Sequence, residues 1–158
     1  METRTRLLHK IAGVLTVLTF LGTGAYMRFN SPNLFQSDPL VRMMFRSTHI
    51  YILMAGLINL AIGSYFLLSP AGWRRILQFT GSAFLLVAPV LLICAFFYEP
   101  SSKRAERPLT LPAVILLASG TLSHMMSTAR RGINRSSSDL IDHHLAKAAG
   151  ASDYGKRD

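Results

Sequence analysis

The sequence predicts an all-α integral membrane protein, built as a bundle of four transmembrane helices. Half of the 158 residues are apolar, and only 16% are charged. Lys, Arg, Asp and Glu are absent from four segments, residues 11–27, 47–73, 76–98 and 108–129. Each segment reaches the length of about 17–20 residues that a helix needs to cross a bilayer core of about 30 Å.

These segments predict one transmembrane domain at residues 1–128, followed by a tail at residues 129–158. The spans of the transmembrane domain are expected at about 7–27, 47–68, 74–98 and 108–127. Because the four spans and their connections use most of the chain, we expect no second folded domain. The tail is basic and then polar, and a short helix is predicted over residues 139–149.

The first span follows a basic N-terminus and ends near Met27, where Tyr26 and Arg28 mark a membrane interface. It carries several small residues, which let helices approach closely in lipid. It ends without a small-residue cleavage site, so we expect a helix that stays in the protein rather than a signal peptide.

The second helix carries the most distinctive pattern in the chain. Asp38-Pro39 is a typical helix start, because Asp caps free amides and Pro fits the first turn. Arg42, Arg46 and His49 follow at steps of four and three, so they share one face. Gly56 and Gly63 continue nearly that face at steps of seven, and Asn59 lies beside it. We expect the two glycines to pack against another helix and Asn59 to form a polar tie between helices.

The third and fourth spans are separated by residues 99–107, which are predicted to form a short loop. Pro89 lies in the middle of the third span and removes one backbone hydrogen bond, so a neighbour must satisfy the freed carbonyl. The fourth helix is expected to start at Pro108. It carries His124 four residues after Gly120, on the same face.

Basic residues are more frequent on one side of the predicted bundle. The N-terminus, the second connection and the tail carry eleven Lys and Arg residues, and the other side carries six. The positive-inside rule therefore predicts that both termini are cytoplasmic, and the short loops favour a bacterial inner membrane. The net charge of +9 comes from basic residues beside the spans, which orient the protein and contact anionic lipid headgroups. The charge is therefore no reason to expect a nucleic-acid partner.

The residue types inside the spans exclude several kinds of chemistry. The predicted spans contain no Asp or Glu, which argues against a carboxylate proton relay or cation path. The single cysteine, Cys94, excludes an intramolecular disulfide and a thiolate metal cluster. No complete set of catalytic residues is recognisable, so we do not expect an enzyme.

Histidines are the remaining candidates for a cofactor site. His9 and His124 are expected near the cytoplasmic face and could hold haem b together, with Gly13 and Gly120 four residues from each. His49 lies about 20 Å away in depth, so it cannot share a metal with His124. A five-coordinate haem on His49, with arginines near its propionates, is a second possibility. Four helices with histidines near the membrane faces resemble small cytochrome-b-type proteins in architecture only, and this resemblance assigns no role to any residue here.

The face of Arg42, Arg46 and His49 also suits an anionic lipid headgroup or an acidic partner, which needs no cofactor. Three functions remain open. The first is a non-catalytic accessory or structural subunit of a larger membrane assembly, with other subunits or a second copy as its partner. The second is a haem-b electron-transfer protein. The third is a transporter or channel for a small neutral or lipidic molecule, with a cavity near Asn59.

Overall fold

A computed structural model describes residues 2–30, 38–65, 72–102 and 106–127 of the chain. Its helices are α1 (Glu2–Phe29), α3 (Pro39–Tyr65), α4 (Gly72–Ser102) and a helix at Thr110–Ser127, which we call the 110–127 helix. All four are long and apolar enough to cross a membrane, which confirms the predicted all-helical fold with four candidate spans. The short helix predicted over residues 139–149 lies outside the described residues.

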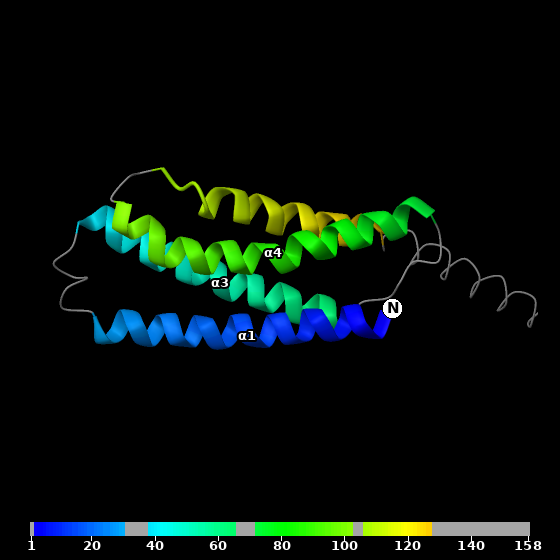
Figure 1. Cartoon of the computed structure of the whole chain (residues 1–158), viewed down its shortest axis with the longest axis horizontal. Helices are drawn as coiled ribbons and strands as arrows, with labels where there is room; N and C mark the ends of the chain where they lie inside the picture. The colour runs from blue at the N-terminus through cyan, green and yellow to red at the C-terminus, as the bar shows by residue number, and fades with distance from the viewer. Residues whose placement is uncertain (1, 31–37, 66–71, 103–105, 128–158) are drawn as a thin grey trace, which may run out of the picture.

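The helices run side by side along the length of the molecule, and consecutive helices point in opposite directions (Figure 1). At one end of the bundle, which we call the N-terminal end, lie the start of α1, the end of α3, the start of α4 and the end of the 110–127 helix. At the other, the distal end, lie the end of α1, the start of α3, the end of α4 and the start of the 110–127 helix. The described chain therefore begins and ends its helical part at the same end.

The distribution of side chains differs from that in a water-soluble bundle. Large apolar side chains are exposed on every helix, including Leu15 and Leu18 on α1, Ile50 on α3, Val90 on α4 and Ile115 on the 110–127 helix. Polar side chains are buried: His9, Thr16, Thr23, Thr48, Asn59, Gln78, Ser82, Glu99, Thr110, His124 and Ser127. An apolar surface of this extent on four long helices suggests an integral membrane protein.

Two kinds of contact hold the helices together. An apolar core joins α3, α4 and the 110–127 helix through Ile52, Ala55, Leu85, Ala88, Leu92, Phe96, Ala113 and Leu117. α1 packs mainly on α3. There the helices approach so closely that a Cβ atom on Gly63 would lie 2.8 Å from the backbone nitrogen of Lys10. Close approach of this kind increases van der Waals contact, which drives helix association in lipid.

The structure corrects the predicted loop at residues 99–107. α4 continues through Ser102, with Glu99 and Pro100 buried inside it. The helix does not end at the first charged residue, because the start of the next helix supplies hydrogen bonds to the Glu99 carboxylate. That next helix begins at Thr110, two residues later than predicted. At the start of α3, the Leu40 amide donates to the Asp38 carboxylate over 2.9 Å, as expected for a cap.

Candidate functional site

A buried polar cluster in the half of the bundle nearer the N-terminal end joins all four helices. We call it the histidine cluster, and its members are His9 on α1, Asn59 on α3, Ser82 on α4 and His124 on the 110–127 helix. All four side chains are buried. Buried polar side chains at membrane depth are candidates for function, but they also tie helices together. Their hydrogen bonds distinguish these roles.

Asn59 is the centre of the histidine cluster. Its Nδ2 donates to the carbonyl of Ala55 over 2.9 Å and to that of Leu85 over 2.8 Å. Its Oδ1 lies 2.7 Å from His9 Nδ1. Leu85 precedes Pro89 by four residues, so its carbonyl is the one that Pro89 leaves without a helical donor. Asn59 thus replaces the missing amide of α4 with an amide from α3.

The amide of Asn59 also determines which ring nitrogen of His9 carries the hydrogen. Because Asn59 Oδ1 can only accept, His9 Nδ1 must donate, and the neutral ring then carries its lone pair on Nε2. The rings of His9 and His124 lie edge to face, with their centroids 6.2 Å apart. His124 Nε2 lies 3.2 Å from Ser82 Oγ. The structure therefore brings together the two histidines that the sequence placed at one depth.

The surroundings of these histidines do not fit a haem. In the haem hypothesis, small surfaces at Gly13 and Gly120 would suit the porphyrin. A Cβ atom on Gly13 would instead lie 2.7 Å from Leu60 Cγ, and one on Gly120 would lie 2.8 Å from Leu85 Cγ. Both surfaces are thus covered by neighbouring helices. Among the described residues, no group of three or more His, Cys, Asp or Glu side chains is placed to hold a metal ion.

His49 lies apart from the histidine cluster, at the contact between α1 and α3. Its Nδ1 is 2.9 Å from Thr23 Oγ1, and its ring stacks on Phe20 with the centroids 4.1 Å apart. A Cβ atom on Gly24 would approach the ring within 3.3 Å. The ring is thus packed against α1, which does not support a haem on this histidine.

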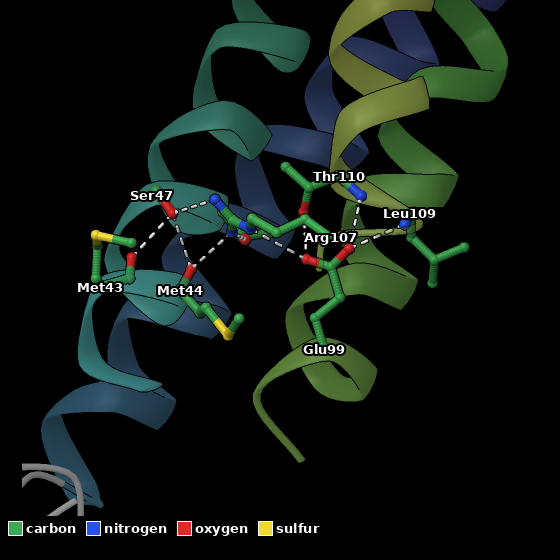
Figure 2. A network of polar contacts seen from close by, with 8 residues as sticks. Met43, Met44, Ser47, Glu99, Arg107, Leu109 and Thr110 are labelled. Atoms are coloured by element: carbon green, nitrogen blue, oxygen red, sulfur yellow. Dashed lines mark hydrogen bonds and ion pairs between the residues drawn. The ribbon is translucent and has the colours of Figure 1, made fainter. Parts of the chain in front are cut away.

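The sequence did not predict a second buried polar network, at the distal end (Figure 2). The Glu99 carboxylate accepts hydrogen bonds from the amides of Leu109 and Thr110, at 2.9 and 2.8 Å, and from the Thr110 hydroxyl at 2.6 Å. Glu99 thereby caps the N-terminus of the 110–127 helix from α4, where a negative charge also complements the helix dipole. Glu99 is 1% exposed, so the carboxylate depends on these donors.

Arg107 extends the same network to α3 (Figure 2). Its Nε lies 3.4 Å from the Glu99 carboxylate. Its guanidinium donates to the hydroxyls of Ser47 and Thr48, at 2.9 and 2.7 Å. Arg107, which lies just before the 110–127 helix, thus connects α3 with α4. The sequence contained one signal of this network: two hydroxyl side chains, Ser47 and Thr48, lie at the same end of the predicted bundle as Arg107. About 60 residues separate them from Arg107, so no local pattern indicates the contact.

Arg42 and Arg46 line a groove on the surface of α3 near the distal end. The groove has a volume of about 500 Å³, and its lining residues are Pro39, Arg42, Met43, Arg46, Ser47 and Ile50. His49 is not among them, so the predicted face of two arginines and one histidine is divided between this groove and the contact with α1. Gly56 and Gly63 both face α1.

Comparisons with protein-family models, with curated proteins and with solved structures found no match for this chain. The function is therefore argued from the geometry of the molecule.

Proposed function

We propose that this protein is a non-catalytic accessory or structural subunit of a larger membrane assembly. One observation carries the proposal: several polar side chains inside the apolar helices bond to other helices. Asn59 bonds to α1 and α4, His49 to α1, and Glu99 to the start of the 110–127 helix. Such bonds stabilise one arrangement of helices, and they occupy groups that would otherwise bind a substrate.

The two other functions have less support. A transporter of small neutral molecules was expected to have a cavity beside Asn59, but that side chain is fully buried and makes three hydrogen bonds. A haem-b protein has the contact between His9 and His124 in its favour. The covered surfaces of Gly13 and Gly120 count against it, because a porphyrin between the rings would have to part these helix contacts.

The proposed location is a bacterial inner membrane, with both termini in the cytoplasm. The excess of Lys and Arg at the N-terminus, the second connection and the tail supports this orientation. Both ends of the helical part lie at the N-terminal end of the bundle, as an even number of crossings requires (Figure 1). The proposed partners are other integral membrane subunits or a second copy of the chain, surrounded by anionic lipid headgroups.

The proposal is tested by extracting an epitope-tagged protein from native membranes in a mild detergent and separating the extract by native electrophoresis. We expect a discrete species larger than the detergent-bound 17.5 kDa chain. The same partner should appear whether the tag is at the N- or the C-terminus, and after chemical cross-linking in intact cells. Co-expression of two differently tagged copies distinguishes self-association from a different subunit.

An absorption spectrum of the same preparation, taken oxidised and then reduced with dithionite, tests the haem alternative. We expect only the protein band from cells supplied with haem. A monomer under all conditions would overturn the proposal. A Soret band with sharp reduced bands, lost in His9→Ala and His124→Ala, would replace it with electron transfer.

A further inference from the structure

We infer that the groove lined by Arg42 and Arg46 on α3 binds the headgroup of an anionic phospholipid. The two arginines are four residues apart on one helix face, and both line the groove. Arg42 is half-buried and Arg46 is exposed. This inference goes beyond the proposed function and does not depend on it, because a lipid site can exist in a protein with any role.

Among the residues that the structure describes, no acidic side chain forms an ion pair with Arg42 or Arg46. Residues 28–46 and 99–107 contain six Lys and Arg residues but only three acidic ones, Asp38, Glu99 and Glu106. Glu99 is engaged with Arg107 and the start of the 110–127 helix. Asp38 caps the Leu40 amide of α3. Two like charges one helical turn apart repel each other, so a bound phosphate would relieve an unfavourable interaction.

The apolar lining of the groove identifies the kind of anion. Met43 is 56% exposed and Ile50 is 61% exposed, and both lie beside the arginines. Further along α3, Met54 and Leu57 are also exposed, so an apolar surface continues from the groove towards the middle of the bundle. A free inorganic phosphate would gain nothing from this surface. A phospholipid places its phosphate on the guanidinium groups and its acyl chain along the apolar side chains.

The position of the groove on α3 also matches a lipid headgroup. Its lining begins at Pro39, the first residue of α3, and reaches Ile50. A helix of 27 residues is about 40 Å long, which exceeds the core of about 30 Å and brings its first turns to headgroup level. The hydrogen bond from Arg107 to Ser47 fixes one wall of the groove to the network at the distal end. The groove is therefore held in place by contacts independent of any lipid.

The test compares lipid retention by native mass spectrometry of the full chain, purified in detergent and mixed with phosphatidylglycerol, phosphatidylcholine or inorganic phosphate. We expect phosphatidylglycerol to bind more tightly than phosphatidylcholine. Removing both charges in R42Q/R46Q should weaken phosphatidylglycerol binding about tenfold. The affinity of R42K/R46K for phosphatidylglycerol should lie between those of the wild type and R42Q/R46Q, because lysine keeps the charge but loses the bidentate contact.

The matched control is R74Q/R75Q, which removes two charges from α4 at the other end of the bundle. It should weaken phosphatidylglycerol binding much less than R42Q/R46Q does, because Arg74 and Arg75 are flanking charges that do not line the groove. A thermal midpoint for each variant, measured without added lipid, shows whether the fold is kept. Equal binding of the two lipids, or unchanged binding in R42Q/R46Q, would overturn the inference. Saturable binding of inorganic phosphate that is lost in R42Q/R46Q would make the groove a site for a soluble anion and would also overturn the inference.

Discussion

Asn59 on α3 donates a 2.8 Å hydrogen bond to the Leu85 carbonyl on α4, where Pro89 cannot supply the usual helical donor. The Oδ1 atom of the same side chain accepts a hydrogen bond from His9 Nδ1–H on α1. One amide therefore links three helices and also repairs a helix that contains a proline. In lipid, where water cannot substitute, such a repair has to come from a neighbouring side chain.

Substituting Asn59→Leu is expected to lower the free energy of unfolding by about 2 kcal/mol, because the Leu85 carbonyl and His9 Nδ1–H lose a buried partner. The measurement is the thermal or denaturant midpoint of the purified protein in one detergent. The variant Asn59→Leu/Pro89→Ala restores a backbone donor for Leu85, so it should recover about half of the loss. Strictly additive effects of the two substitutions would show that Asn59 and Pro89 are not coupled.

The positions of the helices could be predicted because charge is excluded from the bilayer core, and this pattern is local in the sequence. The contacts between helices could not be predicted in this way. Pro89 predicted that some neighbour must satisfy a carbonyl, and Asn59 predicted that some neighbour must satisfy an amide. Which residue meets which depends on helix rotation and register, and the chain segment that separates Asn59 from Leu85, 26 positions later, does not determine these.

The predicted site was incomplete for two physical reasons. Glu99 and Arg107 were read as loop charges, since hydropathy treats a charged residue as the end of a span. The helix can continue past Glu99 because its buried carboxylate accepts hydrogen bonds from amides at the start of the next helix. The depth argument placed His9 and His124 at one level, and their rings do meet. Spacing alone could not reveal that Leu60 and Leu85 cover the adjacent glycines.

Glu99 should be a major stabilising residue of the distal end. Glu99→Ala leaves two amides and a hydroxyl without their acceptor and Arg107 without its ion pair, so we expect a loss of about 3 kcal/mol. Glu99→Gln keeps an acceptor for the amides and should cost less. Glu106→Gln is the matched control, because Glu106 is exposed and close in sequence. If Glu106→Gln destabilised the protein as much as Glu99→Gln, the loss would reflect net charge and not the cap. Unfolding midpoints in detergent measure all three variants.

Close packing of α1 on α3 predicts a difference between two glycines. In Gly63→Ala the new methyl group would lie 2.8 Å from the Lys10 backbone nitrogen and 3.0 Å from the Arg6 carbonyl, so the helices must move apart. We expect a loss of about 1–3 kcal/mol. Gly22→Ala is the control on α1, because open space surrounds that position and alanine favours the helix. Unfolding midpoints of the two variants should therefore move in opposite directions. Equal midpoints would mean that α1 and α3 are further apart than described.

The proposed orientation predicts which end of the bundle is accessible from outside the cell. In a Cys94→Ala background, a cysteine at Thr3 would report the N-terminal end, and a cysteine at Glu106 would report the distal end, because both positions are exposed. A membrane-impermeant maleimide applied to intact cells should label Glu106→Cys and leave Thr3→Cys unlabelled, since the positive-inside rule keeps the N-terminal end in the cytoplasm. Both should react after the membrane is permeabilised, which controls for intrinsic reactivity. The reverse pattern would show the opposite orientation, and labelling of both positions in intact cells would contradict a bundle that spans the membrane in this way.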